Sequence, residues 1–165
     1  QLLRPFKMNQ LARDEFSAKA ESRFLVMKER LDRVVYSLLR LESRSQALEF
    51  YLRIANQEAS FSDLAARYSQ GKERNTNGVV GPAPLTQSHP VLTEKLRAAK
   101  PGQLFEPFRI DRWWLVARLE RFSPATFDKK MSDQMSMELL QEWVQQETSR
   151  KLAAFDLNYN GTAQA

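Results

Sequence analysis

The stretch WWLVARLERF, residues Trp113–Phe122, begins with two adjacent tryptophans and continues with branched, aromatic and charged residues. Such residues are enriched in strands, so the stretch predicts a β-strand that ends near Ser123-Pro124. The segment LFEPFRI (104–110) precedes it and is separated from it only by Asp111-Arg112, which predicts a hairpin. Pro107 cannot donate a ladder hydrogen bond, so the first strand of this hairpin should lie at a sheet edge.

Composition limits the classes of protein to which the chain can belong. It has 165 residues, of which 42% are hydrophobic and 27% charged, as expected for about one globular domain with attachments. The absence of cysteine excludes disulfides, thiol nucleophiles and cysteine-based metal sites. The net charge is +5, but Lys and Arg alternate with Asp and Glu nearly everywhere, which is typical of a mixed-charge surface rather than a nucleic-acid-binding patch.

Other patterns predict the remaining elements. Apolar residues at helical spacing mark the first thirty residues and the segment from Asp128 to Phe155, where Trp143 is expected to be buried between the two terminal helices. RVVYSLLRL (33–41) predicts a strand, and two helices should follow, with start signals at Ser43 and Ser60. Further along, NGVVGP (77–82) predicts turns with positive φ at its glycines, and a short helix should begin near Pro90.

These elements predict an α+β fold. A small, mostly antiparallel four-stranded sheet is surrounded by helices, and the N- and C-terminal helices pack together. The expected parts are an N-terminal helical segment (1–31), the α+β domain (32–123), a C-terminal helix (124–156) and a flexible tail (157–165). No apolar run approaches the roughly 20 residues that a membrane span requires.

The order of elements and several local motifs resemble a parvulin-type (PpiC, rotamase) peptidyl-prolyl cis-trans isomerase domain. FSDLAARYS (61–69) is similar to the F-x-x-L-A-x-x-x-S pattern of that family, and NGVVG stands where the family has G-G-D-L-G. SHPVL, KPGQLFEPF and a last strand ending in RLE follow in the same order and spacing. With its flanking helices the chain is similar to SurA- and PrsA-like foldases and to parvulin-like proteins of cyanobacteria.

The resemblance implies a peptide groove whose catalytic positions have changed. The family's first-strand His falls at Ser37, or at Tyr36 if the register differs by one residue. The family's Asp or Cys falls near Gly71, and its last-strand His falls at Trp114. The implied pocket wall contains Ser88, Leu92 and Val80, and no cofactor or metal is expected. The only histidine, His89, lies outside these catalytic positions and reads as a residue at a helix start.

Isomerisation crosses a barrier of about 18–20 kcal/mol, and an enzyme must bind the twisted amide more tightly than either planar form. With the polar positions replaced, we expect a protein-folding factor that binds proline-containing or unfolded peptides with weak or no turnover. On this reading Trp113 packs toward the body of the domain and Trp114 forms an aromatic wall of the groove. An active isomerase is the first alternative, and a basic scaffold that docks on an acidic partner is the second.

Partners and location follow from the same resemblance. Unfolded or proline-containing segments are the expected partners, without nucleic acid and without a membrane span, and the terminal helices offer a route to a homo-oligomer. The likeness to SurA- and PrsA-like foldases implies an extracytoplasmic location. A cytoplasmic location is the alternative, because no signal peptide is visible in the sequence.

Overall fold

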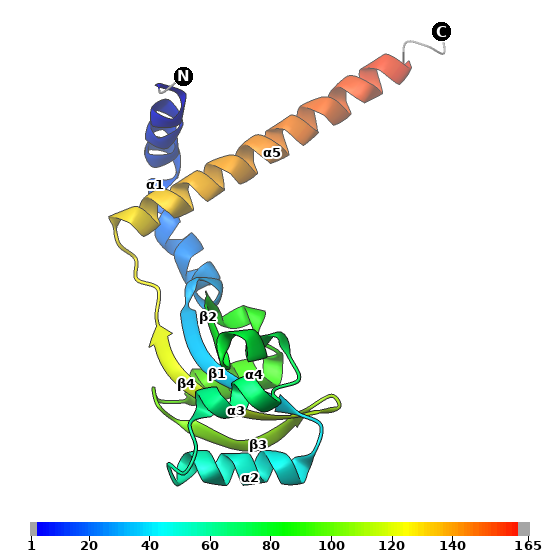
Figure 1. Ribbon diagram of the computed structural model, residues 1–165. Helices are drawn as coiled ribbons and strands as arrows, with labels where there is room; N and C mark the ends of the chain where they lie inside the picture. The colour runs from blue at the N-terminus through cyan, green and yellow to red at the C-terminus, as the bar shows by residue number, and fades with distance from the viewer. Residues whose placement is uncertain (1–2, 162–165) are drawn as a thin grey trace. The chain divides into compact units, whose positions relative to one another are not determined.

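The computed structural model describes the backbone of residues 3–161 and the side chains of residues 7–155 (Figure 1). Its elements in chain order are α1 (Leu3–Leu31), β1 (Arg33–Leu41), α2 (Arg44–Ala55), α3 (Phe61–Tyr68), the 3-10 helix η1 (Lys72–Thr76), β2 (Val79–Pro84), the 3-10 helix η2 (Leu85–Gln87), α4 (Pro90–Ala98), β3 (Leu104–Ile110), β4 (Trp113–Ser123) and α5 (Lys129–Gly161).

The four strands form one antiparallel sheet in the order β2-β1-β4-β3, which confirms the predicted fold class. The central pair runs in register from Arg33 opposite Ser123 to Leu41 opposite Trp114, with an irregularity between Val35 and Tyr36. The two outer strands each contain proline, at positions 82 and 84 in β2 and 107 in β3. Proline at an exposed strand edge hinders pairing with another chain.

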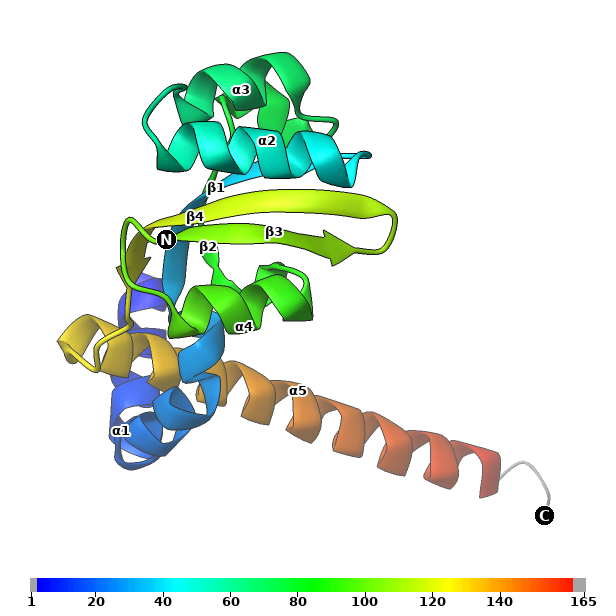
Figure 2. The same cartoon turned by 90° about the horizontal axis from the view of Figure 1, so that it is seen from below.

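Helices cover both faces of the sheet, so the sheet has two apolar cores. Helices α2 and α3 lie on one face and α4 lies on the other (Figure 2). The core on the α4 side is built around Leu38, Leu92, Leu96 and Leu115. The core on the side of α2 and α3 is built around Leu39, Phe50, Leu64 and Val116. The alternation of side chains along β1 and β4 supplies both cores from the same two strands.

Local signals in the sequence set several boundaries as predicted. The hydroxyl oxygens of Ser43 and Ser60 accept hydrogen bonds from the backbone N–H groups of Gln46 and Asp63, which begins α2 and α3. Gly81 has a φ of 106°, and a Cβ there would lie only 2.4 Å from the backbone oxygen of Val34. Only glycine fits this close approach of β2 to β1.

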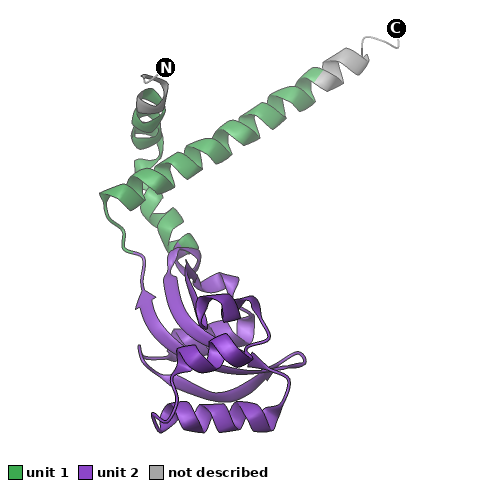
Figure 3. Ribbon diagram, in the orientation of Figure 1, with its two compact units in different colours: residues 1–27, 126–165 green, residues 28–125 purple. Residues whose placement is uncertain are grey.

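The chain divides into two compact units, residues 28–125 and residues 1–27 with 126–165 (Figure 3). The first unit contains the sheet and its covering helices. In the second, the main parts of α1 and α5 share a core in which Ala20, Met135 and Leu140 are buried and the rings of Phe24 and Phe127 lie 5.4 Å apart.

Two expectations about the C-terminal helix are wrong. The side chain of Trp143 is 49% exposed, because the described part of α1 does not cover it fully. The tail predicted from Leu157 continues α5 as far as Gly161, and residues 162–165 lie outside the described residues. None of the helices within residues 3–161 combines the length and apolar character needed to cross a membrane.

Asp32 joins the two ends of the sheet-containing unit. Its Oδ1 atom accepts a hydrogen bond of 2.8 Å from the backbone N–H of Ala125 and one of 3.1 Å from Nζ of Lys28. The backbone oxygen of Asp32 also accepts from the N–H of Leu85. One buried residue thus holds the start of β1, the exit of β4 and the turn after β2.

We therefore expect Asp32→Ala to destabilise the protein by about 1–3 kcal/mol, because the Ala125 N–H loses its acceptor in a half-buried place. Asp32→Asn, which keeps an oxygen acceptor, should lose less. Urea denaturation followed by circular dichroism measures both free energies of unfolding. Equal stability of Asp32→Ala and the wild type would contradict this role.

In the helical unit, Arg13 of α1 and Asp133 of α5 form a bidentate ion pair. Nε and one terminal nitrogen of Arg13 each lie 2.6 Å from a carboxylate oxygen of Asp133. The hydrogen bonds from Arg13 lower the pKa of Asp133 below its usual value of 3.8. The unfolded chain then binds more protons than the folded one in acid, so the stability from this pair is present above the unfolded pKa.

This stability should be lost as the pH falls through the lowered pKa of Asp133. We expect Asp133→Asn to flatten the acid limb of the thermal midpoint measured between about pH 5 and pH 2. Glu138→Gln, on the same helix, is the control that removes a carboxylate without removing this pair. An identical acid limb in the wild type and Asp133→Asn would show that the pair does not stabilise the unit.

Candidate functional site

Two adjoining hollows lie on the α4 side of the sheet. The first, about 330 Å³, is bounded by the two central strands, by α4 with the turn before it and by the β3–β4 hairpin; its residues include Tyr36, Leu38, Ser88, Leu92 and Trp113. The second, about 390 Å³, is bounded by β1, η1 and β2 and includes Val80. Both are lined by Tyr36, Leu38 and Arg40, so we treat them as one α4-side groove.

The strands position the apolar side chains of the α4-side groove. Tyr36 and Leu38 alternate along β1 on this face, and Val80 of β2 lies opposite Tyr36 in the ladder. Leu92, near the start of α4, is buried against them. The half-buried indole of Trp113 packs against the same core.

Three polar side chains at the wall of the groove take part in hydrogen bonds. The hydroxyl of Ser88 donates to the hydroxyl oxygen of Tyr36 at 3.4 Å. His89 begins α4, and its Nδ1 accepts from the backbone N–H of Val91 at 3.3 Å, which places the proton of a neutral imidazole on Nε2. The expectation that His89 lies at a helix start is confirmed, although its side chain also lines the groove.

The buried carboxylate of Glu73 fixes the end of the groove. Its Oε1 atom accepts from the hydroxyl of Ser69 at 2.7 Å and lies 3.5 Å from Nε of Arg40. The backbone N–H of Arg40 in turn donates to the hydroxyl oxygen of Ser69. The sequence analysis missed this cluster. Arg40, a charged residue in the otherwise apolar second half of β1, could have indicated it.

The structure brings four predicted groove residues together and separates two from them. Tyr36, Val80, Ser88 and Leu92 meet on the α4 side. The facing predicted for Trp114 is wrong. It pairs with Leu41 and packs on the opposite core, where the guanidinium of Arg44 lies 5.4 Å from its ring centroid.

The two tryptophans have exchanged the places expected of them. Trp113 was expected to pack toward the body of the domain, yet it lines the groove. The guanidinium carbon of Arg112 lies 4.6 Å from the centroid of its ring. The facing of Trp113 follows from the register. Leu115 and Leu119 face α4, and Trp113 lies an even number of residues from both, so its side chain is on the same face.

The other two positions implied by the resemblance lie outside the groove lining. Ser37 faces the side of α2 and α3, where its buried hydroxyl donates to Glu120 at 2.6 Å. Gly71 precedes η1 and belongs to the lining of neither groove hollow. A Cβ at Gly71 would lie 2.2 Å from a carboxylate oxygen of Glu73, so the position has no room for an Asp or Cys unless Glu73 moves.

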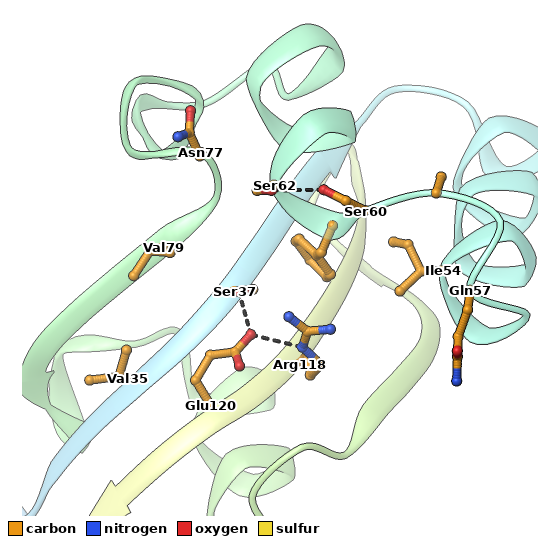
Figure 4. A pocket seen from close by; sticks show the side chains of 12 residues that line it. Val35, Ser37, Ile54, Gln57, Ser60, Ser62, Asn77, Val79, Arg118 and Glu120 are labelled. Atoms are coloured by element: carbon orange, nitrogen blue, oxygen red, sulfur yellow. Dashed lines mark hydrogen bonds and ion pairs between the residues drawn. The ribbon is translucent and has the colours of Figure 1, made fainter.

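A larger hollow of about 710 Å³ lies on the opposite face of the sheet, beside the start of α3 (Figure 4). We call it the α3-side hollow. Ser37, Arg118 and Glu120 form its polar wall, and Val35, Val79 and Phe61 contribute apolar surface. Although it is larger than either groove hollow, only Ser37 among the predicted site residues lines it.

Comparison with known proteins identifies a family. The family model of the rotamase, or PPIC-type PPIase, domain matches residues 36–121. A curated relative, the chaperone SurA of Shewanella sp. (strain MR-7), is 34% identical over 82 residues, which are 48% of this chain and 19% of SurA. SurA of Shewanella oneidensis (strain MR-1) matches to the same extent. The chain thus spans about a fifth of the length of these curated relatives.

Solved structures share the fold at lower sequence identity. Bacillus cereus PrsA, a peptidylprolyl isomerase, has a TM-score of 0.57 at 17% identity over 97% of this chain and 62% of its own. A PpiC-type peptidyl-prolyl cis-trans isomerase domain has a TM-score of 0.52 at 20% identity over 61% of this chain and 99% of its own. A structure from work on the SurA-like chaperones PEB4 and Cj1289 of Campylobacter jejuni has a TM-score of 0.53 at 16% identity, over 93% of this chain and 68% of its own.

The matched residues include most of the two central strands, the covering helices and every side chain named in the α4-side groove. Because the family model covers more than half of the sequence, this chain belongs to the rotamase family of PPIC-type peptidyl-prolyl isomerase domains, the parvulins.

Proposed function

We propose that this chain is a parvulin-type folding factor that binds proline-containing or unfolded segments in the α4-side groove, with weak or no isomerase turnover. The observation that carries the proposal is the meeting of Trp113, Tyr36 and Leu92 on one face of the sheet. The name of its curated relative, the chaperone SurA, agrees with a role in protein folding.

The lining of the groove favours binding by burial. A prolyl ring placed against Trp113, Tyr36 and Leu92 removes apolar surface from water, and each 40 Å² removed contributes about 1 kcal/mol. The aromatic faces add specific contacts with the ring and its neighbours. Such contacts bind planar and twisted amides nearly equally, so they strengthen binding without lowering the barrier.

Apart from Tyr36, no polar group that lines this groove stands at a position that the resemblance assigns to catalysis. The hydroxyl groups of Tyr36 and Ser88 hydrogen-bond with each other, and the imidazole of His89 caps α4. The guanidinium of Arg40 is paired with the carboxylate of Glu73. An acceleration of about a thousandfold needs roughly 4 kcal/mol of additional transition-state binding. The groove would have to supply it without the polar side chains that the resemblance places at the catalytic positions.

An active isomerase is the alternative, and one observation favours it. The hydroxyl of Tyr36 lies in the groove beside the apolar surface that would hold the prolyl ring. Because Ser88 is the donor in their hydrogen bond, the O–H of Tyr36 can itself donate to the carbonyl oxygen of the twisted amide. Hydrophobic desolvation of the amide would then add to the effect.

The helical unit offers a second apolar surface to an unfolded segment. A hollow of about 490 Å³ is lined by Leu11, Phe16, Leu140 and Trp143, together with Glu15 and Lys19. The side chains of Leu11 and Trp143 are exposed. Contact with unfolded segments here would add to binding in the groove, and self-association of two copies through the same side chains is the competing use.

Affinity for a proline-containing peptide tests the groove. We expect Trp113→Ala to weaken binding about tenfold, or 1.4 kcal/mol, because a large apolar contact is lost. Trp114→Ala is the matched control, since its side chain packs on the opposite core. Fluorescence anisotropy of a labelled peptide gives both affinities, and circular dichroism checks that each variant folds. A loss with Trp114→Ala but not with Trp113→Ala would overturn the proposal.

Protease-coupled isomerisation of Xaa-Pro peptides tests turnover. Over a panel of Xaa residues we expect rates within a fewfold of the uncatalysed value, even where anisotropy shows that the peptide binds. Tyr36→Phe should leave those rates unchanged. An acceleration of about a thousandfold that Tyr36→Phe abolishes would establish the active-isomerase alternative instead.

A further inference from the structure

The α3-side hollow contains an ion pair that is held from two sides. Oε1 of Glu120 accepts from the hydroxyl of Ser37 at 2.6 Å and from Nε of Arg118 at 2.8 Å (Figure 4). The guanidinium of Arg118 lies 5.4 Å from the centroid of the buried Phe61 ring. Neighbouring strands and α3 thus fix the orientation of both charged groups.

The same pair leaves hydrogen-bonding groups available in the hollow. Among the residues whose side chains the structure describes, 7–155, none hydrogen-bonds to Oε2 of Glu120 or to the two terminal nitrogens of Arg118. The hollow therefore offers one acceptor beside several donors. A peptide unit carries one N–H donor and one C=O acceptor, so the pair complements the main chain of a bound segment.

Apolar side chains surround this polar wall. Val35 and Val79 flank Ser37 on the sheet, and Ile54 and Phe61 close the other side of the hollow. Val79 is 43% exposed, so its side chain offers apolar surface to a bound segment. An apolar side chain of a bound segment would bury this surface while its main chain meets Arg118 and Glu120.

The hollow and the α4-side groove meet at the edge of the sheet. Val79 lines both the α3-side hollow and the second hollow of the groove. In the ladder, Val79 lies opposite Ser37 and Val80 opposite Tyr36, so the two sites begin at neighbouring positions of the outer strand β2. About three or four extended residues, at roughly 3.3 Å each, suffice to cross one strand.

We propose that the α3-side hollow is an extension subsite for the polypeptide that occupies the α4-side groove. A segment passes over the start of β2 at Val79, places an apolar side chain against Val35 and Phe61, and hydrogen-bonds through its main chain to Arg118 and Glu120. Main-chain recognition tolerates many sequences, which suits a client that is unfolded. This inference rests on the proposed function of the groove.

Peptide length separates the extension subsite from the groove. The probes are a labelled peptide of about four residues centred on proline, and one of about twelve residues with flanking apolar positions, long enough to cross β2. Arg118→Met keeps an apolar stem over Phe61 but removes the donors. Arg121→Ala is the control, because Arg121 is an exposed residue of the same strand that lines neither site and its loss changes the charge equally.

We expect Arg118→Met to weaken the long peptide about fivefold to tenfold and to leave the short peptide within about twofold. Arg121→Ala should change neither affinity, and Trp113→Ala should weaken both peptides. If Arg118→Met leaves the long peptide unchanged while Trp113→Ala weakens both, the extension subsite is wrong and the groove stands.

Other outcomes overturn the account differently. If Trp113→Ala changes neither peptide, the groove proposal fails, and the extension from it fails as well. Equal losses for the short and long peptides with Arg118→Met would show an effect on the whole domain and contradict a separate subsite. Circular dichroism and urea denaturation of Arg118→Met identify such a general loss of folding.

Discussion

The hydrogen-bond register of β4 between β1 and β3 is the constraint on which the domain depends. Strand β4 is paired on both sides, so a slip by one residue would move every side chain to the other face. Leu115 and Leu119 enter the core beneath α4, and Val116 enters the core beneath α2 and α3. This double burial fixes Trp113 in the α4-side groove and turns Trp114 away from it.

The same register decides what the two faces of the sheet can do. On the α4 side, Tyr36, Leu92 and Trp113 offer apolar and aromatic surface among polar groups, with Ser88 hydrogen-bonded to Tyr36 and Arg40 beside Glu73. On the other face, beside the start of α3, Ser37, Arg118 and Glu120 form a fixed polar wall. Burial on one face and main-chain hydrogen bonding on the other are both ways to hold a polypeptide of varied sequence. Neither needs the polar catalytic side chains that the family resemblance implies at Ser37, Gly71 and Trp114.

Much of the fold could be predicted because its signals are local. The extent of β1 followed from the run of branched and aromatic residues at 33–41, the starts of α2 and α3 from Ser43 and Ser60, and the position of β3 at a sheet edge from Pro107. The facing of the two tryptophans was not predictable in the same way. It depends on long-range pairing with β1, which includes an irregularity between Val35 and Tyr36. The alternation of side chains along β4 alone does not reveal which of its two faces meets α4.

The candidate site was predictable in part for the same reason. Tyr36, Val80, Ser88 and Leu92 came from family-like spacing, but the clusters around Glu73 and Glu120 join residues 29 and 83 positions apart. Such contacts exist only once the sheet has formed. The described part of α1 leaves half of Trp143 exposed, which helical spacing alone could not reveal.

The most direct test of the central claim uses the three tryptophans as separate reporters. Fluorine NMR of the 5-fluorotryptophan-labelled protein, with each resonance assigned from single Trp→Phe variants, follows titration with a short proline-containing peptide. The account predicts that the Trp113 resonance shifts with the occupancy of the groove while the Trp114 resonance stays in place. A shift at Trp114 with an unchanged Trp113 would contradict the account, because binding would then lie on the opposite face of the sheet.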